Sequence, residues 1–390
     1  MKLKVRNIRY MTNAFIITLL LVMTGCREED VIFIPEEIEV AQPEYTSLKG
    51  MFVLNEGNMG SNKATLDYYS FSTGRYTRNI FAFANPTVPK EMGDVGNDLG
   101  IYGNKLYAVI NCSNKIDVMD KNTVKKIGQI DIPNCRYIKF YDGYAYVTSY
   151  AGEVVINPDY EQIGYVAKVD TATLQVVDRC NVGFQPDELD IVNGKIYVAN
   201  SGGYMVPNYE NTISVIDIET FKEEGRIPIA INLQGCRSDR RGVLWIFSRG
   251  DYYENQSMIY AYDTRHSRLL KSFDCRVSNM WLDGDSLYVI GVQFSYVTMK
   301  SEVTYAIINT ATLEKVSDCF ITDGTEKDIV LPYGVAVNPI TKDIYVTDAK
   351  DYVSPGHLYC FDAAGKLKWD VRTGDIPGHF AFLGDTTNDY

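Results

Sequence analysis

Histidine is scarce in this chain, and the residue groupings that most catalytic and metal sites require are missing. The three histidines, His266, His357 and His379, have no spacing typical of metal ligands. No C-x-x-C pair, no G-x-S-x-G nucleophile motif and no glycine-rich phosphate loop before a helix occurs. We therefore expect no metal, no catalytic cofactor and no enzymatic activity. The adjacent acids Asp187 and Glu188 keep a hydrolase or a calcium-dependent lactonase open as the alternative.

Positive charge is also in short supply. Lys and Arg number 38 against 50 Asp and Glu, which gives a formal net charge of −12. Removal of the four basic residues near the N-terminus would bring this charge to −16. A surface so acidic repels nucleic acid and anionic lipid, and it disfavours polyanionic ligands.

The eight cysteines do not form an obvious disulfide framework. If Cys26 is set aside for lipidation, seven remain, and an odd number cannot all pair. Cys112, Cys135 and Cys236 fall on the same kind of loop in the repeat described below, so a Cys112–Cys135 disulfide is a candidate. The remaining four lie within strand patterns, where we expect small buried hydrophobic side chains: Cys180, Cys275, Cys319 and Cys360.

The N-terminus has the pattern of a secretory signal. Lys2, Lys4, Arg6 and Arg9 precede an apolar run, residues 14–22, that is too short for a typical membrane-spanning helix. Met23-Thr24-Gly25-Cys26 resembles a bacterial lipobox, with Met23 in place of the usual leucine. The resemblance implies a signal peptide over residues 1–25 and lipidation of Cys26, so that the only membrane contact is the lipid anchor.

The segment after Cys26 indicates the destination. Arg27, Glu28, Glu29 and Asp30 resemble the export signal that sends Bacteroidetes lipoproteins to the outer face of the outer membrane; a solvated charge run is the alternative. Residues 31–49 contain Pro35, Pro43 and several Glu, a composition typical of a tether. We therefore expect residues 26–49 to hold a folded domain, residues 50–390, outside the cell.

An internal repeat of roughly 40 to 55 residues runs through that domain. One strand recurs with an aromatic residue at a constant place, usually after a Gly-, Asn- or Asp-containing turn. A second strand ending in Asp or Asn follows, and then a Thr- or Gly-containing turn and a further strand. The recurring aromatics are Tyr107, Tyr146, Tyr197, Trp245, Tyr288 and Tyr345. Four antiparallel strands per unit are the signature of a β-propeller blade.

The two ends of the domain complement each other. Met51–Leu54 and Thr65–Tyr69 form a unit that lacks its opening strand, and His379–Leu383 matches the opening strand Glu188–Val192 of another unit. The C-terminal strand can therefore complete the first blade and remove two exposed sheet edges. The sequence predicts an all-β, seven-bladed propeller closed in this way.

Residues 51–70 read M-F-V-L-N-E-G-N-M-G-S-N-K-A-T-L-D-Y-Y-S. This segment resembles the opening of the YncE-related lipoprotein propellers of Bacteroides-type bacteria, and the resemblance extends over residues 50–384. Among these proteins are the BtuG proteins, which capture cobalamin and other corrinoids at the cell surface. The resemblance implies corrinoid as the bound ligand and a TonB-dependent outer-membrane transporter of the BtuB type as the partner.

Ligand contacts are expected on the loops that surround one mouth of the central channel. These loops combine broad aromatic planes with amide, carboxylate and guanidinium groups. The candidates are Asn97, Asp98, Arg136, Tyr137, Tyr150, Asp187, Tyr204, Tyr209, Arg237, Tyr252, Tyr253, Phe294, Tyr296, Tyr333 and Tyr352. A corrin ring edged with amides fits such a surface, but so does a glycan, and a purely protein-binding scaffold remains a third possibility.

Overall fold

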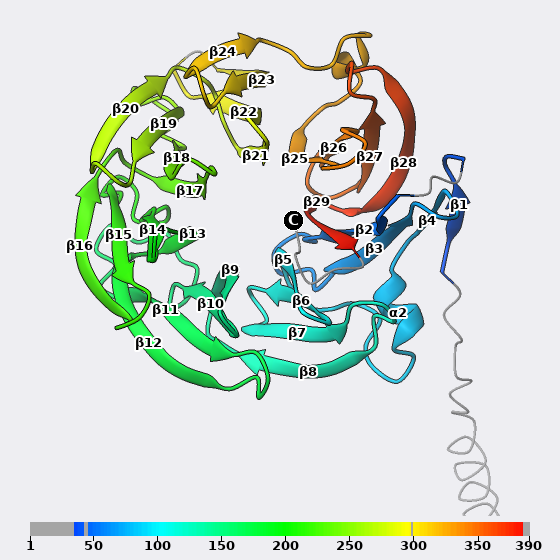
Figure 1. Cartoon of the computed structure of the whole chain (residues 1–390), viewed down its shortest axis with the longest axis horizontal. Coiled ribbons are helices and arrows are strands. Elements are labelled where there is room, and N and C mark those ends of the chain that lie inside the picture. The colour runs from blue at the N-terminus through cyan, green and yellow to red at the C-terminus, as the bar shows by residue number, and fades with distance from the viewer. Residues whose placement is uncertain (1–34, 43–45, 298, 385–390) are drawn as a thin grey trace, which may run out of the picture. The chain divides into compact units, whose positions relative to one another are not determined.

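The computed structural model describes residues 35–42, 46–297 and 299–384. The predicted signal peptide (1–25), the lipidation site Cys26 and the charged segment 27–30 lie outside these residues. Within the described ranges, no helix is long and apolar enough to cross a membrane. The described part of the chain forms seven antiparallel sheets arranged in a ring, which confirms the predicted propeller (Figure 1).

Six blades consist of four strands taken in chain order, from the axis of the ring outward (Figure 1). The second and third blades contain β5 (Gly96–Tyr102), β6 (Lys105–Ile110), β7 (Lys115–Asp120), β8 (Lys126–Asp131), β9 (Cys135–Tyr141), β10 (Tyr144–Ser149), β11 (Ile163–Asp170) and β12 (Val176–Phe184). The fourth and fifth contain β13 (Pro186–Val192), β14 (Lys195–Asn200), β15 (Thr212–Asp217), β16 (Lys222–Pro228), β17 (Leu233–Ser238), β18 (Val243–Ser248), β19 (Met258–Asp263) and β20 (Arg268–Phe273). The sixth and seventh contain β21 (Asn279–Asp283), β22 (Ser286–Ser295), β23 (Lys300–Asn309), β24 (Glu314–Ser317), β25 (Pro332–Val337), β26 (Ile344–Asp348), β27 (Pro355–Phe361) and β28 (Leu367–Asp375).

The first blade joins the two ends of the domain. Its strand order is β1-β4-β3-β2-β29, built from β1 (Glu37–Glu39), β2 (Leu48–Asn55), β3 (Thr65–Ser70), β4 (Arg75–Thr77) and β29 (Pro377–Gly384). The innermost strand, β29, therefore closes the ring as predicted, with Val53 opposite Phe380 (Figure 1). The expected tether, in contrast, is partly structured. β1 adds a fifth strand by pairing with β4, because this pairing satisfies backbone hydrogen-bonding groups at the edge of the sheet. β2 also begins within the expected tether, at Leu48.

The Asp that recurs at the end of most third strands has a local role. The Asp120 carboxylate accepts hydrogen bonds from the backbone N–H and hydroxyl of Thr123, at 2.9 and 3.0 Å. Asp170 does the same with Thr173 at 2.8 and 3.1 Å. These bonds lower the pKa of Asp170 and form a turn after which the chain adopts a positive φ, as at Leu174. The repeated Asp therefore shapes the hairpin to the outermost strand.

The recurring aromatic residues fill the spaces between blades. Trp245, Tyr107, Tyr146 and Tyr345 are almost fully buried, and Tyr197 is buried as well, so these side chains belong to the core. The equivalent Tyr288 is only half-buried. Large flat side chains at this place bridge neighbouring sheets, which pack about 10 Å apart. Two short helical segments complete the described structure: α2 (Ile80–Ala84) and η1 (Thr325–Lys327).

No disulfide joins any two of the seven cysteines in the described ranges. The candidate Cys112–Cys135 disulfide is therefore wrong. Cys135 is fully buried, and its thiol lies 3.4 Å from the Lys115 carbonyl oxygen instead. Burial raises the pKa of the Cys135 thiol to about 12, which keeps it protonated. Cys180, Cys275 and Cys360 are buried as predicted, whereas Cys319 is partly exposed.

We expect Phe382 to be a main anchor of the closing strand. Its ring centroid lies 6.0 Å from Trp281 on β21 and 6.2 Å from Tyr345 on β26, so it joins three blades. Phe382→Ala should lower the free energy of unfolding by about 3–5 kcal/mol, through lost burial and a residual cavity. Equilibrium urea denaturation measures this loss. Leu367→Ala, on the outermost strand β28 with 39% exposure, is the control, and an equal loss in both variants would contradict the anchoring role.

Candidate functional site

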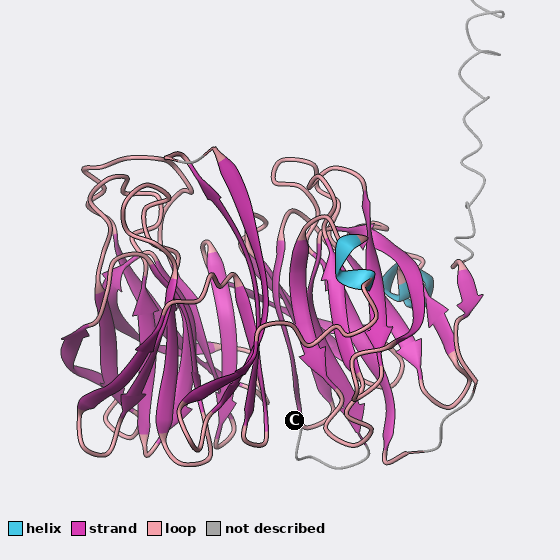
Figure 2. Cartoon of the chain, turned by 90° about the horizontal axis from the view of Figure 1, so that it is seen from above, coloured by secondary structure: helices cyan, strands magenta, loops and turns pink. Residues whose placement is uncertain are grey.

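One end of the ring gathers the loops between the second and third strands of each blade and the connections between blades, because strand direction alternates. Hydrogen bonds join neighbouring loops at this end. The Tyr296 N–H donates to the Tyr252 carbonyl oxygen at 3.1 Å, and the Asn58 side-chain amide donates to the Tyr352 carbonyl oxygen at 2.9 Å. We call this end the mouth face. Figure 2 shows the ring from the side, with loops at its two ends.

A cavity of about 390 Å³ opens on the mouth face. This volume falls within the range of roughly 300–1,000 Å³ common for ligand sites. Its walls combine aromatic, amide and charged side chains from all seven blades, and we call it the mouth cavity. The principal lining residues are Glu56, Asn58, Asn97, Asn111, Cys112, Arg136, Tyr137, Tyr204, Gln234, Arg249, Ser278, Asn279, Tyr333, Tyr352 and His379.

Several innermost strands are preceded by a residue whose backbone is in the left-handed region, with a positive φ. Asn134, Gln185 and Asn232 have φ of 41°, 46° and 54°, and the β-branched Val95 and Ile376 have φ of 60° and 55°. A positive φ is unfavourable for β-branched side chains, and such strain persists only where the surrounding structure enforces it. Val95 and Ile376 both line the mouth cavity. The turns therefore aim the following residues at the mouth at a cost in local stability.

A buried ion pair supports one wall of the mouth cavity. The Arg136 guanidinium on β9 lies 2.9 Å from the Asp187 carboxylate on β13, and the Tyr150 hydroxyl donates to the same oxygen at 2.8 Å. Arg136 also lies over the Tyr150 ring, 4.8 Å from its centroid. Burial alone would lower the pKa of Arg136, but Tyr150 and Asp187 outweigh it and raise that pKa well above its usual value. Arg136 therefore stays charged and fixed in orientation.

A second cluster joins the first and last blades. The Tyr333 hydroxyl donates to one carboxylate oxygen of Glu56 at 2.8 Å, and the His379 Nε2 lies 3.0 Å from the other. Burial, with the Glu56 charge added, raises the pKa of Tyr333 well above its usual value, so the phenol stays neutral. Gly378 permits this approach, because a Cβ there would lie 2.8 Å from the Glu56 Oε1.

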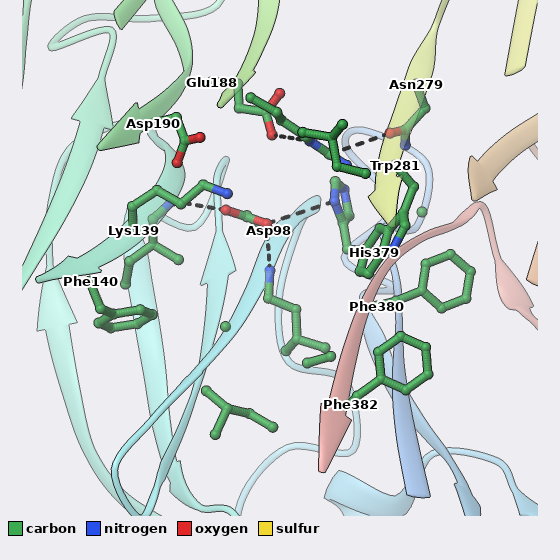
Figure 3. Close-up of a pocket in the computed structure, with 18 of the residues that line it drawn as sticks. Asp98, Lys139, Phe140, Glu188, Asp190, Asn279, Trp281, His379, Phe380 and Phe382 are labelled. Carbon is green, nitrogen blue, oxygen red and sulfur yellow. Dashed lines mark hydrogen bonds and ion pairs between the residues drawn. The ribbon is translucent and has the colours of Figure 1, made fainter. Parts of the chain in front are cut away.

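Below the mouth cavity, the central channel encloses about 690 Å³ and shares Asn279 and His379 with it. Side chains two residues apart on one innermost strand face the channel together, because the strand repeat is two. Glu188 and Asp190 do so on β13, as do Asn279 and Trp281 on β21. Figure 3 shows these side chains converging with Asp98, Lys139 and His379.

Some charged side chains in the channel have a close polar partner, and one has none among the described residues. Glu188 lies 2.8 Å from Arg237 Nε, and Asp190 accepts a hydrogen bond from the Ser238 hydroxyl at 2.6 Å. The Lys139 ammonium has no hydrogen-bond or ion-pair partner among the residues that the structure describes. Burial would lower the pKa of Lys139, but Asp190 and Glu188 outweigh it and raise that pKa. Lys139 is therefore a charged group that points into the channel (Figure 3).

The fifteen predicted contact residues divide into three groups. Six line the mouth cavity: Asn97, Arg136, Tyr137, Tyr204, Tyr333 and Tyr352. Asp98 and Arg237 line the channel instead. Seven do not line either space: Tyr150, Asp187, Tyr209, Tyr252, Tyr253, Phe294 and Tyr296. Tyr150 and Asp187 are buried beneath Arg136, where they orient it.

Three of the remaining aromatics form a cluster on the rim. Tyr253 and Tyr296 stack with ring centroids 5.0 Å apart and an interplanar angle of 20°, and Phe294 meets Tyr296 edge-on at 5.1 Å. Tyr253 and Tyr296 are 55% and 54% exposed. These rings therefore present an exposed aromatic surface outside the mouth cavity.

The sequence prediction missed several residues of these spaces, among them Glu56, Arg249, Lys139, Trp281 and His379. A signal existed for His379, because the alignment of its strand with Glu188–Val192 places it level with Glu188, which faces the channel. Glu56 and Arg249 had no such signal, since each follows a second strand in a loop with no fixed register. Within the described ranges, no cluster of three His, Cys, Asp or Glu is arranged to hold a metal ion.

The fold and the lined mouth define the class: a seven-bladed β-propeller with a polar, aromatic cavity on one face. Residues 49–382 match the family described as a domain of unknown function, DUF5074. The chain therefore belongs to this family. No curated protein matches the chain.

Several solved structures share the fold. Hydrazine synthase of Kuenenia stuttgartiensis matches with a TM-score of 0.57 at 16% identity, covering 76% of this chain and 94% of that one. A quinonprotein alcohol dehydrogenase-like protein of Bacteroides thetaiotaomicron matches with a TM-score of 0.57 at 11% identity, covering 88% and 80%. The Pan2 WD40 domain of Neurospora crassa matches with a TM-score of 0.52 at 10% identity, covering 76% and 88%. At such low identities the likeness shows the fold alone.

We expect the Arg136–Asp187 pair to be essential to the wall of the mouth cavity. Asp187→Ala should lower the free energy of unfolding by about 3–5 kcal/mol, because it leaves a buried guanidinium without its counter-charge. Equilibrium urea denaturation measures the effect. The double variant Arg136→Met, Asp187→Leu is the control and should recover most of the loss. A loss below about 1 kcal/mol for Asp187→Ala, as for a surface pair, would show that the pair is effectively solvated.

Proposed function

We propose that this protein is a binding protein rather than an enzyme, and that the mouth cavity captures a corrinoid. The observation that carries the proposal is the composition of the cavity wall. Tyr137, Tyr204, Tyr333 and Tyr352 supply aromatic rings, and amide side chains such as Asn58 and Gln234 line the same cavity. A corrin is a broad, nearly flat ring edged with amide arms. It can stack on the phenol rings and exchange hydrogen bonds with the amides.

The acids at the mouth are engaged in structural contacts. Asp187 binds Arg136, Glu188 binds Arg237, and Glu56 accepts from Tyr333. These contacts orient the wall and favour a role in binding over a role as general acid or base. A preorganised wall also keeps the ordering cost of binding low.

The location forms part of the same proposal. The lipobox-like Met23–Cys26 and the following acidic run favour a lipid anchor on the outer face of the outer membrane. The resemblance to the BtuG group favours delivery of the corrinoid to a TonB-dependent transporter of the BtuB type. Delivery needs a partner, because tight capture alone releases its cargo slowly.

Glycan binding is the second candidate function. The stacked pair Tyr253 and Tyr296 on the rim favours it, since sugar rings pack on exposed aromatic faces. The two candidates use different aromatic residues, so substitutions can separate them.

Titration of the full chain with cyanocobalamin tests the first candidate. We expect saturation at one equivalent with sub-micromolar or tighter affinity. Tyr204→Ala should weaken binding about tenfold or more, because it removes a stacking face of the mouth cavity. Tyr253→Ala is the matched control on the rim and should leave corrinoid affinity unchanged. Absence of binding at high micromolar cyanocobalamin, together with binding of neutral oligosaccharides that Tyr253→Ala abolishes, would favour the glycan function.

The cysteines provide an independent footprint of the site. Cys112 lines the mouth cavity, whereas Cys319, the other partly exposed thiol, lies on the connection after β24. Burial raises the pKa of both thiols, so maleimide labelling should be slow and should quicken with rising pH. Bound cyanocobalamin should slow the labelling of Cys112 and leave that of Cys319 unchanged. Mass spectrometry of the labelled peptides measures both rates, and equal protection of both would place the ligand elsewhere.

A further inference from the structure

Three arginines reach the mouth face or the channel beneath it, and their counter-charges differ. Arg136 is neutralised by Asp187 at 2.9 Å, and Arg237 by Glu188 at 2.8 Å. Arg249, which lines the mouth cavity, has no carboxylate within ion-pair distance among the described residues. The cavity wall therefore contains one guanidinium whose charge no described acid neutralises.

The hydrogen bonds of the Arg249 side chain are also incomplete. Nη2 makes one long contact, 3.5 Å from the Val292 carbonyl oxygen. Nε is buried and has no hydrogen-bond partner among the described residues. A guanidinium carries five N–H donors, and donors that are shielded from water without a partner are unfavourable. Most N–H groups of the Arg249 guanidinium therefore lack a described hydrogen-bond acceptor, and a ligand can supply one.

The surroundings hold Arg249 in place without neutralising it. Its guanidinium lies 5.9 Å from the centroid of the Tyr252 ring, a cation–π contact. It also acts on Tyr352 across the mouth, where its charge partly offsets the rise that burial causes in the pKa of that phenol. Gln234 and Ser278 line the same cavity and add neutral hydrogen-bonding groups. The arrangement is that of a preformed site for one anionic group.

We infer that Arg249 is an anion-recognition residue of the mouth cavity. The ligand carries one carboxylate or phosphate group, which the planar guanidinium fork of Arg249 binds. This inference rests on the proposed function of the cavity and adds the charge of the ligand to it. The fork matches the geometry of two oxygens of a carboxylate or phosphate. The acidic chain, with a net charge of −12, disfavours a polyanion, so one anionic group within a larger neutral ligand is the class that fits.

Three corrinoids that differ in their anionic groups test the inference. Cyanocobalamin carries a phosphodiester, cobyric acid carries a carboxylate without the phosphodiester, and dicyanocobinamide carries neither. In titrations of the full chain, Arg249→Gln should weaken the binding of an anionic corrinoid about tenfold or more and leave cobinamide unchanged. An effect on cyanocobalamin alone identifies the phosphodiester as the group bound, and an effect on cobyric acid alone identifies the carboxylate. An equal effect of Arg249→Gln on all three, or on none, would overturn the inference while the proposed function stands.

Two variants sharpen this comparison. Arg249→Lys keeps the positive charge but lacks the planar guanidinium. Its affinity for an anionic corrinoid should lie between that of the unchanged protein and that of Arg249→Gln. Arg265→Gln removes the same charge from an exposed arginine in the turn between β19 and β20, at the other end of the ring, and should change nothing. A loss of affinity in Arg265→Gln equal to that in Arg249→Gln would show a general charge effect and contradict a specific site.

If the protein binds no corrinoid, the proposed function fails and the anion site is tested alone. The Arg249 Nε–Hε NMR signal is identified by its absence from the spectrum of Arg249→Gln. Inorganic phosphate and sodium acetate, titrated separately at constant ionic strength, should shift this signal in a saturable way. The absence of a saturable shift with both anions would overturn the inference.

Discussion

The pairing of β2 with β29 is the interaction on which the rest of the structure depends. It joins the two ends of the domain in one sheet, with Leu54 opposite His379 and Asn55 opposite Pro377. Without this pair, the first blade would lack its innermost strand and one edge of β2 would be left unpaired. The same pairing sets Glu56, which follows β2, against His379 on β29. The strand pairing that closes the ring therefore also forms one wall of the mouth cavity.

Polar contacts between neighbouring innermost strands reinforce the ring. The Asp98 carboxylate on β5 accepts the Ile138 N–H of the next blade at 2.8 Å. Glu188 on β13 accepts the Cys236 N–H of the blade after it at 3.2 Å. The two bonds occupy equivalent places in the repeat, and buried carboxylates of this kind need such donors. Acids that look like catalytic candidates in the sequence thus serve largely to hold adjacent blades in register.

This use of acids shapes what the mouth can bind. Once Asp187 and Glu188 are committed to Arg136 and Arg237, the groups left to meet a ligand are phenol rings, amides and the Arg249 guanidinium. Under the proposed function, such a surface suits a large, partly flat, polar molecule better than a small ion.

The sequence by itself determined the architecture. The recurring aromatic strand, the turn signals and the Asp-ended strand predict four strands per blade, because these patterns act over a few residues. The match of His379–Leu383 to Glu188–Val192 likewise predicted the closing strand. The sequence also indicated that Asn97, Arg136 and Tyr137 lie near the mouth, because each stands close to the start of an innermost strand, and all three line the mouth cavity. Their role as ligand contacts stays a prediction.

Only the tertiary structure decided which side chains meet. Glu56 and His379 are 323 positions apart, and their contact depends on the register of β2 with β29. Tyr253 and Tyr150 belong to loops of the right kind, yet one stacks on the rim and the other is buried under Arg136. Local patterns specify strands and turns, whereas convergence at the mouth depends on the paths of loops from several blades, which only the closed ring brings together.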